Sequence, residues 1–199
     1  MKATIILFLI FNIIKVNSHS AASCTDKRTK EICKGYPRYY HFNHLNTKLP
    51  SSDNSDTFYA SRDRETLIQD GISKVCPEMN IEEYTRDFPM ATVRAGQNLT
   101  LQHPPRGHSK QPSSNVWIYI HPQANIYPTN KQPELNEFVL LNEYPFDNCY
   151  GVEKEISWAN CTGEIQLPKR MKKGVYTFLW RWNLNSIPYS DCFELNVVN

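Results

Sequence analysis

The stretch Gly174-Val-Tyr-Thr-Phe-Leu-Trp-Arg-Trp-Asn183 decides the fold class. Large aromatic side chains recur there at every second position, and Arg181 falls between two of them. Successive side chains of a β-strand point to opposite faces of the sheet, so this spacing predicts a strand with one strongly apolar face. The aromatic residues of that face are Tyr176, Phe178, Trp180 and Trp182. We interpret Trp180 and Trp182 as packing residues and not as platforms for sugars.

Similar short segments surround this stretch and are separated by turns that contain Pro, Asn or Gly. They predict several strands, whereas Arg64–Gly71 predicts one short helix that ends at its glycine. Strands at this spacing predict an all-β protein, an immunoglobulin- or fibronectin-like antiparallel β-sandwich with long disulfide-tied loops in its first half. The predicted strands are Asn98–Gln102, Val116–Ile120, Glu137–Leu141, Glu164–Leu167, Val175–Trp182 and Cys192–Val198.

The six cysteines predict three disulfides, although the sequence alone permits fifteen pairings. Short spacing favours Cys24 with Cys33 and Cys149 with Cys161, and these pairs leave Cys76 to reach Cys192. A zinc or iron cluster is the other use of cysteine. The sequence has no C-x-x-C pair, which argues against such a cluster.

An apolar run from Ala3 to Ile14 follows a short positive region at the start of the chain. A membrane-spanning helix needs about 20 apolar residues, so the run predicts a cleaved signal peptide and not an anchor. Val16 and Ser18 are small or modest in size, as signal peptidase requires three residues and one residue before the cut, so cleavage after Ser18 is expected. Cleavage after Ala22 is a second acceptable site. We expect residues 1–18 to be the signal peptide and residues 19–199 to form a single secreted, extracellular domain.

Composition and charge narrow the class of protein. Of the 199 residues, 40% are hydrophobic and 21% are charged, as in a folded domain. The chain carries 22 Lys and Arg against 20 Asp and Glu, and removal of Lys2 and Lys15 with the signal peptide balances them. This balance argues against a sequence-independent nucleic-acid binder, and we expect no membrane partner either. Glycosylation sequons at Asn98 and Asn160 predict a glycoprotein.

The histidines are the best candidates for chemistry, because the chain has no G-x-S-x-G or H-E-x-x-H motif and no phosphate-binding glycine loop. Cleavage after Ser18 would make His19 the first residue, with a free α-amino group whose pKa lies near 8. That amine and the imidazole of the same residue can chelate one ion, and a second histidine would complete three nitrogen ligands. Such ligation favours Cu(II). The six histidines are His19, His41, His44, His103, His108 and His121.

Several stretches of the chain, together with His19, resemble the lytic polysaccharide monooxygenases. The resemblance covers residues 91–120 and 174–198 together with His19, and residues 20–90 match nothing that we can align. It rests on His19 directly after the signal peptide, Ala95-Gly-Gln-Asn-Leu-Thr-Leu101 followed by Gly107-His108, Val116-Trp-Ile-Tyr119, Gly174–Asn183, and Tyr189-Ser-Asp-Cys-Phe-Glu-Leu-Asn-Val197.

The resemblance implies a metal site and an activity. His19 and His108 would bind one copper ion as a histidine brace, with Tyr189 at the axial position, and these three residues would be both catalytic and metal-binding. A disulfide between Cys76 and Cys192 would join the first-half loops to the last strand. The protein would be a monomer that oxidatively cleaves the glycosidic bonds of a polysaccharide, using an external reductant with peroxide or dioxygen.

One position departs from the family pattern. Members usually carry Gln or Glu two residues before the axial tyrosine, where this chain has Ile187. Arg106 or Gln102, from the region that leads to His108, is a candidate to take over the role of that Gln or Glu. The departure favours a rival reading, a non-catalytic histidine-brace protein for copper uptake or storage. A further rival is a metal-free secreted sandwich that binds carbohydrate or protein.

Simpler interpretations remain open for several residues. His103 competes with His108 as second ligand, whereas His41, His44 and His121 are expected at the surface. Tyr189 has a second reading as an ordinary core tyrosine. Gly35–Phe42 is either a substrate-contacting loop or internal packing. The basic run Lys169–Lys173 is expected to be a solvated turn, and attraction of an acidic polysaccharide such as pectin is the alternative.

Overall fold

The computed structural model describes residues 22–29, 32–38, 75–76, 84–104, 115–126, 133–150, 160–184 and 187–199. The expected signal peptide and the expected helix at Arg64–Gly71 lie outside these ranges. The strands are β1 (Ala91–Arg94), β2 (Asn98–His103), β3 (Asn115–Ile120), β4 (Val139–Pro145), β5 (Cys149–Tyr150), β6 (Asn160–Gln166), β7 (Gly174–Leu184) and β8 (Ile187–Val198).

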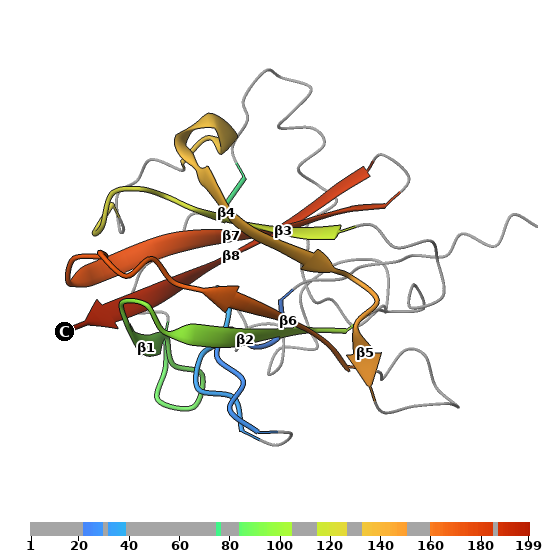
Figure 1. The fold of residues 1–199 in the computed structure, drawn as a ribbon, viewed down its shortest axis with the longest axis horizontal. Helices are drawn as coiled ribbons and strands as arrows, with labels where there is room; N and C mark the ends of the chain where they lie inside the picture. Colours follow the sequence, from blue (N-terminus) through green and yellow to red (C-terminus); the bar gives the residue numbers. More distant parts are fainter. Residues whose placement is uncertain are drawn as a thin grey trace, which may run out of the picture.

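Two sheets face each other, as the sequence predicts (Figure 1). The larger sheet has five strands in the order β1-β8-β7-β3-β4, and the smaller has three in the order β2-β6-β5. Every pairing is antiparallel except that of β1 with β8. The all-β sandwich is therefore confirmed, with one parallel edge strand that the sequence analysis missed.

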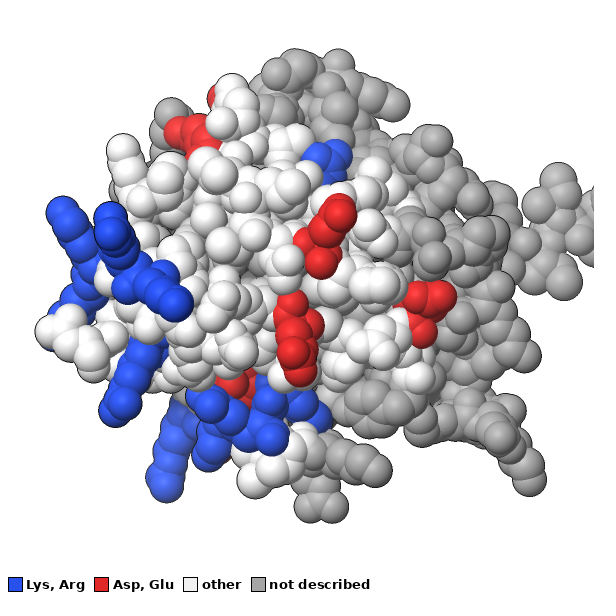
Figure 2. Space-filling view, in the orientation of Figure 1, with Lys and Arg blue, Asp and Glu red and all other residues white. Residues whose placement is uncertain are grey.

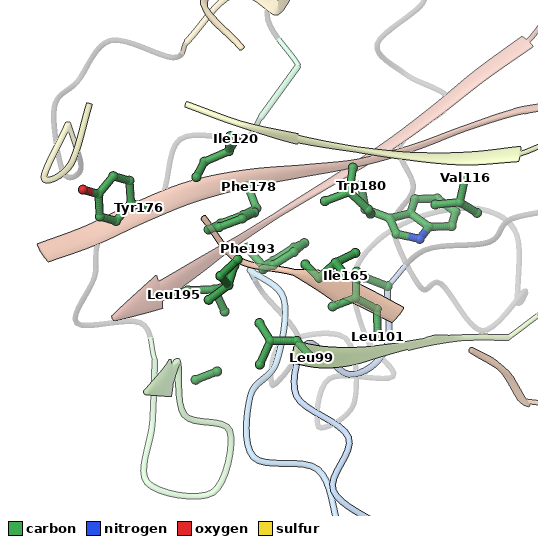
Figure 3. Packing of buried hydrophobic residues seen from close by; sticks show 14 of the residues in the cluster. Leu99, Leu101, Val116, Ile120, Ile165, Tyr176, Phe178, Trp180, Phe193 and Leu195 are labelled. Carbon is green, nitrogen blue, oxygen red and sulfur yellow. The ribbon is translucent and has the colours of Figure 1, made fainter. Parts of the chain in front are cut away.

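The main hydrophobic core lies between the sheets. Leu99 and Leu101 of β2 and Ile165 of β6 point into it from the smaller sheet, and Trp180 and Phe193 point into it from the larger one (Figure 3). The alternation predicted for β7 is confirmed, because Tyr176, Phe178, Trp180 and Trp182 are all buried in this core.

The outer face of the larger sheet is covered as well. Leu179 and Cys192 pack there with Val75, Cys76 and Phe138 in a second apolar cluster. Because β7 and β8 are covered on both faces, they form the most deeply buried part of the fold.

All three predicted disulfides are present, namely Cys24–Cys33, Cys76–Cys192 and Cys149–Cys161. The basic run is a turn between β6 and β7 whose four cationic side chains are exposed, as expected. No helix in the described part of the chain is long and apolar enough to cross a membrane.

The strand predicted at Glu137–Leu141 is displaced toward the C-terminus. Residues Leu135–Glu137 form a 3₁₀ turn that begins with a capping box between Glu134 and Glu137, and β4 starts only at Val139. A capping box ties the side chain of its third residue back to the first backbone N–H. Glu137 is thus held in the turn, which prevents it from starting the strand.

Candidate metal centre

The three predicted site residues are described to different extents. His19 and His108 lie outside the described residues, as do His41 and His44. Tyr189 lies in β8, where its backbone is in register with Trp182 of β7. The described residues nearest to His19 and His108 are those of the N-terminal segment and of the end of β2.

The segment that leads to His19 runs beside the end of β2. The Ser23 N–H donates to the Gln102 carbonyl at 2.7 Å, and the Gln102 N–H donates to the Cys24 carbonyl at 2.8 Å. Cys24 and Gln102 thus form an antiparallel bridge. Ala22 and Pro104 each lie two residues from this bridge, so the chain leaves toward His19 and toward His108 from nearby points.

The same N-terminal segment joins the two sheets. The disulfide Cys24–Cys33 folds it back on itself, and the Thr25 N–H donates to the Gly35 carbonyl at 2.8 Å. Further along, the Arg38 N–H donates to the Cys192 carbonyl of β8 at 2.9 Å. The end of β2 is therefore fixed relative to β8, although the two strands belong to different sheets.

His103, the last residue of β2, is fully buried. Its Nε2 lies 3.1 Å from the Phe146 carbonyl, and its ring packs on Phe146 with centroids 4.7 Å apart. A carbonyl only accepts hydrogen bonds, so Nε2 carries the proton. Nδ1 meets no hydrogen-bond partner among the described residues.

Burial makes His103 a neutral core histidine. Desolvation lowers its pKa to about 4, against a smaller opposing effect of the hydrogen bond to the Phe146 carbonyl. A fully enclosed ring between the sheets is a poor substitute for His108 as a ligand in an open site. His121 is also buried, contrary to expectation, because its ring packs edge-to-face on Phe138 with centroids 5.7 Å apart.

Aromatic contacts connect the end of β2 to β7, and backbone pairing continues the connection from β7 to β8. Phe146 packs on His103 and also stacks on Trp182 with ring centroids 4.0 Å apart. Trp182 is in turn the register partner of Tyr189. The backbone of Tyr189 therefore lies at the end of the sandwich from which the histidine loop departs.

A buried ion pair lies on the outer face of the larger sheet and was missed by the sequence analysis. The Arg38 guanidinium donates to the Glu194 carboxylate, which also accepts from Thr177 at 3.1 Å and from the Tyr84 hydroxyl at 2.7 Å. Burial, and next the adjacent Glu194 charge, raise the pKa of Tyr84 well above its usual value of 10. Glu194 lies two residues after Cys192 in β8, so both side chains point to the same face of the sheet. This alternation is the one feature of the sequence that indicates a covered outer face.

This ion pair bears on the first half of Gly35–Phe42. Pro37 and Arg38 are buried, so this part of the stretch is internal packing, and residues 39–42 lie outside the described residues. Within the described residues, no group of three or more His, Cys, Asp or Glu side chains could hold a metal ion. The predicted ligands are not among those residues.

Among comparisons with known proteins, only the one with solved structures gives matches. No family model matches the chain, and no curated protein matches it. A cellulose-active lytic polysaccharide monooxygenase in complex with copper aligns over 89% of this chain and 98% of its own, with a TM-score of 0.50 and 11% identity. This chain has a lytic polysaccharide monooxygenase fold. The likeness agrees with the β-sandwich that the spacing of the strands predicts, and it supports the family resemblance at the level of the fold.

Two further structures align over shorter parts. A lytic polysaccharide monooxygenase from Streptomyces lividans covers 55% of this chain and 59% of its own, at 14% identity and a TM-score of 0.39. A Bacillus amyloliquefaciens protein in complex with Cu(I) covers 64% of this chain and 62% of its own, at 20% identity and a TM-score of 0.37.

Proposed function

We propose that this chain is a secreted, copper-dependent lytic polysaccharide monooxygenase. His19 would bind one copper ion through its α-amino group and imidazole, His108 would supply the third nitrogen, and Tyr189 would occupy the axial position. The observation that carries the proposal is the backbone pairing of Ser23 and Cys24 with Gln102.

The reach of the two flanking segments supports this assignment. His19 lies three residues before Ala22, and His108 lies four residues after Pro104. An extended chain spans at most about 3.5 Å per residue, which gives a reach of about 10 Å and about 14 Å. Because Ala22 and Pro104 each lie two residues from the Cys24–Gln102 bridge, both segments are long enough for the two histidines to meet at this end of the sandwich.

The donor set suits copper. Two imidazoles and a primary amine are the nitrogen ligands that Cu(II) prefers in a tetragonal arrangement. Copper, when bound, would supply one-electron chemistry with dioxygen or peroxide. The chain's own contribution is to hold the donors, since the disulfide Cys24–Cys33 and the hydrogen bonds to Gln102 fix the N-terminal segment on the end of β2.

The disulfides and one sequon support the secreted location. Three disulfides form among the six cysteines, and such bonds persist in oxidising compartments. Asn98 is exposed at the start of β2, where a glycan could be attached without burial. We therefore propose removal of residues 1–18, release of His19 as the first residue, and glycosylation at Asn98.

Copper binding to the secreted protein tests the proposal. N-terminal sequencing should begin at His19, and titration should give one tightly bound Cu(II) per chain with an axial spectrum in electron paramagnetic resonance. His19→Ala and His108→Ala should each abolish that spectrum. His121→Gln is the matched control, because His121 is buried against Phe138, and it should leave the spectrum unchanged.

Copper binding without catalysis is the second candidate function, and Ile187 favours it. Its aliphatic side chain stands where related enzymes usually carry Gln or Glu. Incubation of the copper-loaded protein with ascorbate, peroxide and each of cellulose, chitin and pectin separates the two functions. Oxidised oligosaccharides support the monooxygenase, whereas tight copper binding with no oxidised product on any of them supports uptake or storage. A mature chain that starts beyond His19 contradicts both.

A further inference from the structure

Cationic side chains gather at the end of the sandwich where β6 turns into β7 (Figure 2). One belongs to Arg94 at the end of β1, and four belong to the β6–β7 turn. All five are exposed. We call this group the cationic tip; its residues are Arg94, Lys169, Arg170, Lys172 and Lys173.

Backbone hydrogen bonds join the two turns of the tip. The Gly96 N–H donates to the Pro168 carbonyl at 3.2 Å, and the Leu167 N–H donates to the Gln97 carbonyl at 2.9 Å. Gly96 has a φ of +77°, and a Cβ atom there would lie 3.2 Å from the Lys169 side chain. The turn that follows Arg94 therefore sits directly against the turn that carries the other four cations.

The β6–β7 turn is held in one conformation. Met171, in the middle of the basic run, packs against the main core, and its N–H donates to the Pro168 carbonyl at 3.4 Å. At the far end of the turn, the Asn125 side chain accepts from the Val175 N–H at 2.8 Å. Because Met171 points inward, the cations on either side of it are presented to solvent together.

Acidic side chains are missing from the stretches around the tip. The described segments 91–102, 118–126, 165–176 and 195–199 contain no Asp or Glu. Away from the tip, Arg28 pairs with Asp26 at 2.7 Å. The tip therefore presents five cations with no acidic residue in these stretches, on a chain whose total charge is only +2. Figure 2 shows a second group of Lys and Arg side chains at the lower edge of the molecule.

We propose that the cationic tip is a docking surface for an anionic extracellular glycan, which binds through its carboxylate or sulfate groups. Arginine can bind such groups with two parallel hydrogen bonds, and lysine binds them as a point charge. The proposal goes beyond the copper site, because the tip lies at the Gly174 end of β7 and Tyr189 pairs near its other end. The strand has 11 residues, which span about 35 Å. A glycan held at the tip would tether the protein without entering the metal centre.

A glycan fits the tip better than other polyanions do. Disulfides place the chain in an oxidising compartment, where acidic glycans are the common polymeric anions. An amphipathic membrane-surface site carries exposed apolar or aromatic side chains beside its cations. The single apolar side chain of the basic run, Met171, instead packs on the core.

Binding of the full secreted protein to immobilised polygalacturonate and to heparin tests the proposal. If two or three ionic contacts form, the affinity should fall about 10- to 40-fold between about 50 and about 200 mM NaCl. Lys172→Glu with Lys173→Glu should weaken binding more than tenfold. Lys27→Glu with Lys34→Glu is the matched control, since it changes the net charge equally at the N-terminal segment, and it should weaken binding less than threefold. Binding to polygalacturonate alone assigns carboxylates, and binding to heparin alone assigns sulfates.

Four results would overturn the proposal. They are no binding to either glycan, binding that is insensitive to salt, equal losses in the two double variants, and tighter binding to duplex DNA or phosphatidylserine vesicles than to the glycans. Copper titration of the same variants keeps the two proposals apart. A tip variant that loses glycan binding and keeps its copper supports the tip independently of the metal centre.

Discussion

Acidification from neutral pH should destabilise the fold, and His103 accounts for a calculable part of the loss. The ring is fully buried, and desolvation lowers its pKa from 6.5 to about 4. Between about pH 6.5 and about pH 4, His103 therefore binds a proton in the unfolded chain but not in the folded one. The contribution of His103 to stability is complete above pH 6.5 and is lost as the pH falls toward 4.

The size of this effect follows from the two pKa values. Integrating the proton uptake gives a loss of about 2.5 kcal/mol between about pH 7.5 and about pH 4.5. With a urea m-value of about 2.5 kcal/mol per molar, the unfolding midpoint should fall by about 1 M. Urea unfolding with disulfides intact measures it, and a chelator in the buffer removes any contribution from bound metal.

Two variants isolate the histidine. In His103→Phe, the loss of unfolding free energy between about pH 7.5 and about pH 4.5 should be smaller than in the wild type by about 2.5 kcal/mol. At neutral pH the variant should be less stable than the wild type, because the Phe146 carbonyl loses its donor. Tyr144→Phe is the matched control from the same cluster, because it removes only the acceptor of the Trp180 indole N–H at 3.1 Å. Its curve should run parallel to the wild type. If the His103→Phe curve also ran parallel, His103 would not be the group that takes up the proton.

Three further predictions concern the outer face and the metal centre. Arg38→Met should destabilise the fold by about 3–5 kcal/mol because it leaves Glu194 buried without its cation, and adding Glu194→Leu should recover most of the loss in thermal unfolding. Replacing Cys76 and Cys192 by serine opens a loop of 116 residues and should cost about 4–5 kcal/mol; an unchanged urea midpoint would contradict this. Tyr189→Phe should alter the copper spectrum and shift the melting temperature by less than about 3 °C. An unchanged spectrum with a lower melting temperature would instead identify Tyr189 as a core residue.

Strands with clear alternation could be predicted from sequence. Val116–Ile120 buries every second side chain, and the alternating aromatic residues of Val175–Trp182 are all buried in the core, so the periodicity alone places both segments in the sandwich. Ala91–Arg94 was missed because four residues give too short a pattern, and its parallel partner β8 lies a hundred residues away in the chain. Cys149–Tyr150 has only two residues and is recognisable only through its pairing with β6.

Long-range contacts explain the remaining differences. Arg38 and Glu194 are 156 residues apart, and nothing in either local sequence indicates that they meet. His121 was expected at the surface, yet Phe138 covers it, and the two residues are 17 positions apart in the chain. The candidate ligands His19 and His108 came from the expected cleavage site and from family resemblance, since a brace made of residues far apart has no local spacing.

The two proposed sites should behave independently, because a rigid strand separates them. β7 runs from Gly174 at the cationic tip to the region of Trp182 near the metal centre, and its residues 176–180 are buried without interruption. Coupling between the ends would require a second packing arrangement of this strand. Core packing on one face and the Cys76–Cys192 layer on the other both oppose such a shift. Substitutions at the two ends should therefore be additive in stability and separate in effect, with glycan docking altered at one end and copper at the other.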